Sequence, residues 1–367
     1  MKKMSYKTDE LLSRSVDLLR FPLAVMVLFI HTKGYADFNI EAMHANPLSS
    51  YSLFQFICIM LSEVLTHIAV PTFFLISGYF FFYKLKDWNV NVYWGKIKKR
   101  FYTLFIPYIL WNLILVLLRF VVAIIKGENA NDFIFPYISD GWYSIFWNIT
   151  KEISEPINFP MWFVRNLMFL CLVSPLIYIY VKRLKIIGLV VLASLYLMRL
   201  HSPFIGIGFA DLFFFAVGAY FSINRISFVD IFSKVRVPIG MLTLLLLGMV
   251  VWFGCKRTET GTALFPFYVL FGVCTAINIA SLLVGRFIIL PNRFLANSSF
   301  FIYASHIVYI LYGWDFILCR LIPTTSLEAK CLVYFGIPTL TTLTCLLIYF
   351  CLKRYTPRIL YVLTGNR

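Results

Sequence analysis

The chain has 367 residues, of which 60% are hydrophobic and 14% are charged, and its mean hydropathy is +0.82. Soluble globular proteins contain about 45–50% apolar and about 25% charged residues, so the soluble, disordered, coiled-coil and disulfide-scaffold classes are excluded. Ten helices of roughly 20 residues, the length that a bilayer core requires, leave about 170 residues for loops and tails. The composition therefore predicts an all-α polytopic membrane protein of about ten transmembrane helices.

Apolar segments follow one another along the whole chain. They lie near residues 16–33, 57–83, 101–125, 160–181, 186–200, 205–223, 237–254, 264–285, 299–320 and 331–352. The stretch 51–83 is too long for one straight helix, so we expect either a kink at Pro71 or a short helix before the span itself. Ser77 and Gly78 are small residues of the kind that permits close helix packing.

The basic residues indicate the topology. The net charge of +16 comes from 33 Lys+Arg against 17 Asp+Glu. With the N-terminus in the cytoplasm, the cytoplasmic segments hold 22 Lys and Arg, the outer segments hold eight, and Lys182, Arg183 and Lys185 form one inner turn. Basic residues accumulate on cytoplasmic loops, so this excess is interpreted as a topology signal, and no nucleic acid partner is expected. The predicted division is a cytoplasmic tail at 1–15, a membrane domain at 16–352 and a cytoplasmic tail at 353–367.

Three further features are less informative. The outer segment 126–159 mixes aromatic and polar residues, which fits either an amphipathic or re-entrant piece at the interface or belt aromatics. The first sixteen residues are polar and no A-x-A site follows the first apolar run, so that run is expected to stay as a helix. None of the eight cysteines is spaced as a zinc site or redox pair, so packed thiols and no metal are expected.

Ionisable residues within the spans are functional candidates, because placing one there costs at least about 2.5 kcal/mol. They are Asp17, Arg20, His31, Glu63, His67, Arg119, Arg165, Asp211, His306 and Asp315. Of these, His67, Arg119 and Asp315 are interpreted as structural.

Arg20 and His31 lie eleven residues apart on the first span. Eleven helical steps return to within about 20° of the starting direction and rise about 16 Å, so the two side chains share a face. Asp17 joins that face one turn before Arg20. This arrangement suits an anionic donor at the cytoplasmic end and a proton acceptor in the outer half. An arginine reaching the inner headgroups and a histidine capping the outer end is the alternative.

Five motifs, in order, resemble those of the acyltransferase-3 family of integral-membrane enzymes. Residues 16–32 read VDLLRFPLAVMVLFIHT and resemble its Arg-x10-His first helix, and residues 70–81 read VPTFFLISGYFF and resemble its Pro-x-Phe-Phe-x-x-Ser-Gly helix. Residues 96–108 (KIKKRFYTLFIPY), 160–167 (PMWFVRNL) and 300–306 (FFIYASH) match its later patterns. One departure is Thr103, where the family often has a second arginine three residues after Arg100.

The resemblance implies ten helices and transfer of an acyl group, usually acetyl, to a glycan hydroxyl. It also implies an acyl-coenzyme A donor, most often acetyl-CoA. Arginine and lysine bind phosphates, so Arg20, Lys99 and Arg100 are the predicted coenzyme A site, and His31 is the predicted base. The family's optional SGNH-type esterase domain is absent from this sequence.

Further site residues follow from the same resemblance. Arg165 is predicted to polarise the thioester carbonyl, with an ion pair to Glu63 or Asp211 as the alternative. Trp162 offers a surface on which a sugar can stack. Tyr303 and His306, one turn apart, are candidates to line the acceptor cavity, although a structural hydrogen bond is the favoured explanation for them.

The predicted function is thus a membrane O-acyltransferase. Its expected partners are acyl-CoA, a glycan or lipid-linked glycan acceptor and membrane lipids, and the expected location is a bacterial inner membrane with both termini cytoplasmic. A secondary transporter or a lipid-linked glycan flippase would also explain charges inside the membrane. The transporter reading is weakened because no inverted repeat is evident in the sequence. A membrane sensor or scaffold leaves the alignment of Arg20 with His31 unexplained.

Overall fold

The computed structural model describes residues 8–32, 40–85, 87–127, 156–200, 202 and 206–366, and within these ranges every regular element is helical. The α-helices are α1 (Thr8–His31), α2 (Ile40–Ala45), α3 (Ser50–Cys58), α4 (Ala69–Phe82), α5 (Val90–Arg100), α6 (Ile106–Ile125), α8 (Trp162–Leu172), α9 (Ser174–Leu197), α10 (Phe209–Ile223), α11 (Phe228–Lys234), α12 (Arg236–Trp252), α13 (Glu259–Gly285), α14 (Arg293–Ser305), α15 (Leu311–Leu321), α16 (Leu327–Tyr355) and α17 (Pro357–Thr364). Short π-helical segments lie at Ile59–Val64, Phe101–Phe105 and His306–Ile310, and 3₁₀ turns at Leu65–Ile68, Phe159–Met161 and Cys255–Arg257.

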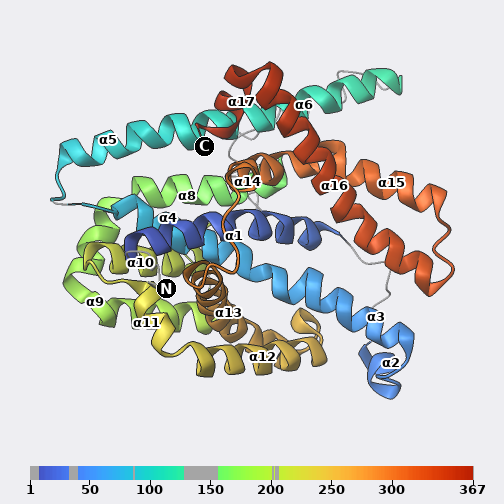
Figure 1. The fold of residues 1–367 in the computed structure, drawn as a ribbon, viewed down its shortest axis with the longest axis horizontal. Helices are drawn as coiled ribbons and strands as arrows, with labels where there is room; N and C mark the ends of the chain where they lie inside the picture. Colours follow the sequence, from blue (N-terminus) through green and yellow to red (C-terminus); the bar gives the residue numbers. More distant parts are fainter. Residues whose placement is uncertain are drawn as a thin grey trace.

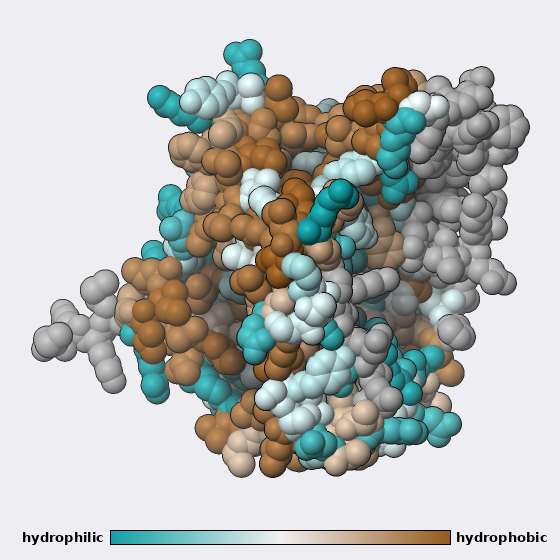
Figure 2. Space-filling view, turned by 90° about the vertical axis from the view of Figure 1, so that its right-hand side faces the viewer, coloured by the Kyte–Doolittle hydropathy of each residue, from teal (hydrophilic) through white to brown (hydrophobic). Residues whose placement is uncertain are grey.

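Several helices are long and apolar enough to cross a membrane. In the described part of the chain there are five: Ser50–Phe82, Val90–Ile125, Glu259–Gly285, Arg293–Leu321 and Leu327–Tyr355. Counting α10 and α11, which meet at 105°, as one bent span raises the number to six. Figure 2 shows a broad hydrophobic area on the surface beside a band of hydrophilic residues. The predicted class of all-α polytopic membrane protein is confirmed, while the count of ten spans stays a prediction.

Helix α1 runs through the middle of the molecule (Figure 1) and packs against α14, α13 and α4. Its apolar residues Leu23, Ala24 and Leu28 are at most 1% exposed. A helix that is enclosed on several sides can hold polar side chains away from lipid, and this is where membrane proteins place functional charges. The central position of α1 therefore carries its last residue, His31, into the interior of the bundle.

The span 51–83 is irregular before Pro71 rather than at it. The helix changes to a π-helical segment at Ile59–Val64 and to a 3₁₀ turn at Leu65–Ile68 before α4 begins. Pro71 lies in the first turn of α4, where its missing N–H costs little because the first four N–H groups of a helix have no intrahelical acceptor. The structure shows no kink at Pro71; α3 continues through the π-helical and 3₁₀ segments into α4, and Ser50–Phe82 together forms one long candidate span.

Helices α4 and α10 cross at two glycines. A Cβ atom on Gly78 would lie 2.1 Å from the carbonyl oxygen of Phe215, and one on Gly218 would lie 2.0 Å from the carbonyl oxygen of Leu75. Both distances are far below van der Waals contact, so only glycine allows the two backbones to approach this closely. The close packing expected at Gly78 is confirmed.

The basic turn predicted around Lys182–Lys185 interrupts α9. Lys185 has φ 48° and ψ −128°, which breaks the helix, and the Tyr180 hydroxyl donates a 2.9 Å hydrogen bond to the Gly188 carbonyl across the break. The predicted boundary between the fourth and fifth apolar segments thus coincides with a break in the helix.

The remaining predictions concern the two tails, the loop 126–159 and the eight cysteines. Helix α1 begins at Thr8 and α17 occupies Pro357–Thr364, so helix extends into both predicted tails. The outer segment 126–159 falls mostly outside the described residues. All eight cysteines are free thiols, as the sequence predicts.

Candidate active site

His31 and His306 face each other where α1 and α14 end. Their ring centroids are 5.4 Å apart, with 37° between the ring planes. Phe159, from the 3₁₀ turn before α8, meets the His31 ring edge-on at 5.7 Å. Three separate parts of the chain therefore converge on His31, and two of the predicted site residues are brought together.

The backbone next to His31 is firmly anchored. The Thr32 hydroxyl donates to the Leu28 carbonyl at 2.9 Å, and the Thr32 carbonyl accepts a 3.1 Å hydrogen bond from the Ser62 hydroxyl. Ser62 also shares a 2.7 Å hydrogen bond with the hydroxyl of Tyr334 on α16. The π-helical segment before α4 and helix α16 thus fix the end of α1 and, with it, the position of the imidazole.

His306 is fully buried, and its ring orientation is set by the last turn of α14. Its Nδ1 atom lies 2.7 Å from the Tyr303 carbonyl oxygen and 3.2 Å from that of Ile302. A carbonyl oxygen can only accept, so Nδ1 carries the hydrogen and Nε2 carries the lone pair. The helix is interrupted directly after His306, where Val308 has ψ 69° and Tyr309 has φ 61°. π-Helical interruptions of this kind are frequent at functional sites.

Tyr303 ties α14 to the segment before α8. Its hydroxyl donates to the Pro160 carbonyl, and its ring packs edge-on against Phe163 with 6.0 Å between centroids. Trp162, at the start of α8, is partly buried. This hydrogen bond agrees with a structural role for Tyr303. It holds the segment before α8 against α14, next to His306.

Arg165 is 3% exposed and belongs to a polar cluster between α8 and α10. Its Nε and Nη2 atoms each donate to Asn166 Oδ1 at 3.1 Å, and Nη2 also lies 3.3 Å from the Gly206 carbonyl oxygen. Asn166 in turn donates to Asp211 Oδ2 at 2.7 Å. Of the two predicted ion partners, Asp211 is reached through Asn166, and Glu63 instead pairs with Arg257.

The three predicted coenzyme A ligands lie on two separate helices, Arg20 on α1 and Lys99 with Arg100 on α5. Arg20 Nη1 lies 3.0 Å from Asp17 Oδ1, and both side chains are partly exposed. Arg100 lies over the Phe81 ring with 5.7 Å to the centroid, and Lys99 is exposed at the end of α5.

Sequence reasoning missed Asn158, which lies next to Phe159 and is fully buried. Its backbone N–H donates to Asn112 Oδ1 at 2.9 Å, and its Nδ2 donates to the Ala304 carbonyl at 3.0 Å. Asn158 thus fastens the segment that carries Phe159 to α14 beside His306. Asn112, an amide in the middle of an apolar span, was the available signal.

A second polar group lies beside the 3₁₀ turn Leu65–Ile68. Lys256 Nζ is 3.4 Å from His67 Nε2 and lies over the Phe265 ring at 5.2 Å. Lys256 belongs to the 3₁₀ turn Cys255–Arg257, which also supplies the Arg257 partner of Glu63. Glu63 and His67 are thus both engaged by this one short segment.

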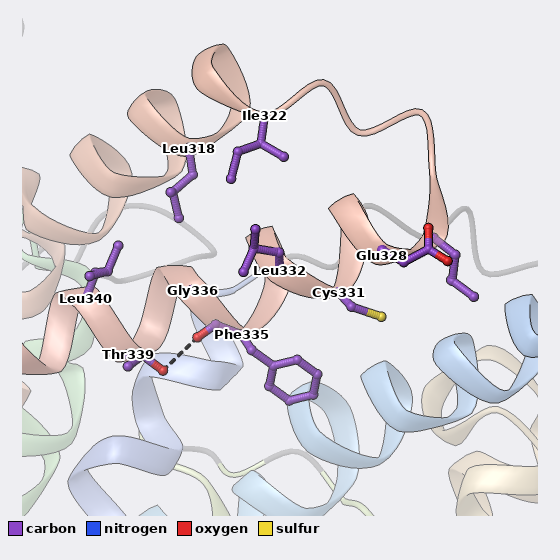
Figure 3. Close-up of a pocket in the computed structure, with 10 residues that line it drawn as sticks. Leu318, Ile322, Glu328, Cys331, Leu332, Phe335, Gly336, Thr339 and Leu340 are labelled. Atoms are coloured by element: carbon purple, nitrogen blue, oxygen red, sulfur yellow. Dashed lines mark hydrogen bonds between the residues drawn. The ribbon is translucent and has the colours of Figure 1, made fainter.

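An apolar groove between α15 and α16 is separate from this site (Figure 3). Leu318 and Ile322 face Leu332 and Leu340 across it, and the Thr339 hydroxyl donates to the Phe335 carbonyl along its floor. None of the predicted site residues lines it. Its lining is mostly apolar, with Glu328, Cys331 and Thr339 as the polar side chains. Because the predicted site residues gather around His31 instead, the histidine site is the candidate active site.

Comparison with known proteins defines the class. A family model described as an acyltransferase domain matches residues 13–357. The chain belongs to the acyltransferase-3 family, and it is therefore a membrane-embedded acyltransferase.

Among individual proteins, the chain is similar to the succinoglycan biosynthesis protein ExoH of Rhizobium meliloti (strain 1021). The two are 25% identical over 376 residues, which cover 98% of this chain and 94% of the relative. No solved structure matches the chain.

Proposed function

We propose that the protein transfers an acyl group from cytoplasmic acyl-CoA to a hydroxyl of a cell-envelope or exported glycan. The acyl group that we propose is acetyl. The observation that carries this proposal is the convergence of His306 and Phe159 on His31 at the end of the central helix α1. The relative's name places it in the biosynthesis of a polysaccharide, which supports a glycan acceptor. The proposed location is a bacterial inner membrane with both termini in the cytoplasm.

His31 acts as the general base in this reaction. It removes the proton from the acceptor hydroxyl while the oxygen attacks the thioester carbonyl. The new C–O bond forms, the C–S bond breaks, and the proton passes from His31 to the departing sulfur. Free coenzyme A and the acylated glycan are the products. Direct transfer needs no covalent enzyme intermediate.

Arg20, Lys99 and Arg100 hold the coenzyme A phosphates at the cytoplasmic end. The last turn of α5 is basic, and Arg20 lies on the His31 face of α1. Eleven residues of helix separate Arg20 from His31 by about 16 Å, a span that an extended phosphopantetheine arm can cover. Arg20 and the basic end of α5 bind the same coenzyme A molecule, because each of its phosphates accepts several charge-assisted hydrogen bonds.

The remaining predicted residues act around the thioester and the sugar. Arg165, held by Asn166 and Gly206, polarises the thioester carbonyl. Trp162 stacks on the sugar ring, and Tyr303 and His306 form the wall behind His31, beyond direct contact with the sugar.

The test is thiol release from acetyl-CoA by the purified protein in nanodiscs, with and without a lipid-linked or cell-surface glycan extract. We expect free coenzyme A only when glycan is present, and we expect Arg20→Ala to lose donor binding. Succinyl-CoA run in parallel reports which acyl group is preferred.

Failure of the wild-type protein to bind either acyl-CoA or to release thiol with any glycan would contradict the proposal. A transporter or a lipid-linked glycan flippase would then become the better explanation, since neither needs coenzyme A.

A further inference from the structure

His306 Nε2 is buried and has no hydrogen-bond partner among the described residues. The hydrogen bonds from Nδ1 to the last carbonyls of α14 fix the tautomer, so Nε2 is an acceptor without a donor. Leaving a buried polar atom unpaired costs about 1–3 kcal/mol, and such exceptions in native proteins call for a cause.

The ring of His31, which faces His306, can supply a donor. Neutral imidazole has one N–H and one lone pair. A direct N–H···N hydrogen bond places two imidazole centroids roughly 5 Å apart. The observed centroid separation of 5.4 Å is close to that value. Hydrogen bonds between catalytic groups are commonly long in the absence of substrate and shorten when it binds.

We propose that His306 is the positioning residue for His31. His306 Nε2 accepts the N–H of His31, and this directs the lone pair of the other His31 nitrogen toward the acceptor hydroxyl. The result is a chain from the Tyr303 carbonyl through His306 to His31. This inference rests on the proposed function, because it assigns the group that orients its base.

The pairing of His31 with His306 also stabilises the positively charged form of His31. When His31 takes the hydroxyl proton it becomes an imidazolium with two N–H groups, and the one facing His306 is already paired. The His306 proton stays on Nδ1 throughout, held by the Tyr303 carbonyl, so only one proton moves: from the hydroxyl to His31 and then to the leaving sulfur. His306 touches neither donor nor acceptor in this scheme.

The test compares two substitutions at one position. His306→Phe keeps a ring of similar size but removes the acceptor, whereas His306→Gln keeps an acceptor near the place of Nε2. We expect His306→Phe to lower kcat on the order of 100-fold with little change in KM for the glycan. His306→Gln should recover a substantial part of that loss. His44→Phe, which replaces a distant histidine stacked on Trp252, is the control and should keep wild-type kcat.

Nitrogen NMR of the protein labelled with ¹⁵N-histidine gives a readout independent of turnover. The His31 N–H resonance should change in His306→Phe and stay in place in His44→Phe, while both variants retain the wild-type elution volume and acetyl-CoA binding.

Two results would overturn the inference. One is a raised KM for the glycan at unchanged kcat in His306→Phe, which would make His306 a contact for the sugar. The other is an unchanged His31 resonance in that variant. A wild-type protein that transfers nothing would instead count against the proposed function, and the NMR comparison would still decide whether the two histidines are paired.

Discussion

At the scale of single residues, Asp17 forms an ion pair with Arg20, the arginine that we propose binds the coenzyme A donor. The Arg20–Asp17 pair is about two-fifths exposed on both sides, and exposed pairs of this kind contribute only about 0–1 kcal/mol to stability. A coenzyme A phosphate must therefore compete with the Asp17 carboxylate for the guanidinium, and the carboxylate also repels the phosphate directly.

This competition predicts opposite effects from the two partners. Asp17→Asn should strengthen acetyl-CoA binding several-fold, and Arg20→Gln should weaken it by about tenfold or more, because a hydrogen bond to a charged group is worth about 1.5–3 kcal/mol. The measurement is displacement of a fluorescent coenzyme A analogue. Glu10→Gln is the matched control, since Glu10 pairs with Arg14 nearer the start of the same helix. If Asp17→Asn weakened binding as Arg20→Gln does, the pair would be structural.

At the scale of helices, the crossing of α4 and α10 tolerates no side chain at its centre. Gly78→Ala would place a Cβ 2.1 Å from a backbone carbonyl oxygen of α10, which cannot move without moving the helix. Overpacking of this kind costs about 1–3 kcal/mol or more, so a clear fall in the thermal unfolding temperature in detergent is expected.

Gly248→Ala on α12 is the control for that prediction. No atom lies within 4 Å of the added methyl group, and alanine favours helix over glycine, so stability should be kept or slightly raised. Equal unfolding temperatures for the two variants would show that α4 and α10 are not in tight contact.

The helices themselves were largely predictable. Apolar runs predicted where many of the helices lie, the basic turn at Lys185 coincides with a break, and Gly78 predicted a close contact. The π-helical and 3₁₀ segments between α3 and α4 were not predictable, since they depend on a partner distant in sequence: Ser62 binds Tyr334 on α16. A proline within an apolar span predicts a kink. Pro71 lies in the first turn of α4, however, where a proline fits without breaking the helix.

At the scale of the whole molecule, the site depends on contacts between residues that are far apart in the sequence. The shared face of Arg20 and His31 follows from helical periodicity within one segment. The meeting of His31 with His306 and with Phe159 does not, because no periodic pattern relates residues so far apart in the sequence. The tautomer of His306 likewise follows only from where α14 ends. A search for ionisable residues within the spans selected His31 and His306, which the structure brings together. The same search could not select a neutral amide such as Asn158.

The central claim is that one site built around His31 joins a donor from one side of the membrane to a glycan acceptor. Its most direct test is thiol release by sealed vesicles of known orientation, with membrane-impermeant acetyl-CoA supplied to one face at a time. The account predicts glycan-dependent release only when acetyl-CoA is on the face that carries the basic end of α5, and no release by a His31→Gln protein that still binds acetyl-CoA. Equal release from either face, or wild-type rates in His31→Gln, would contradict it.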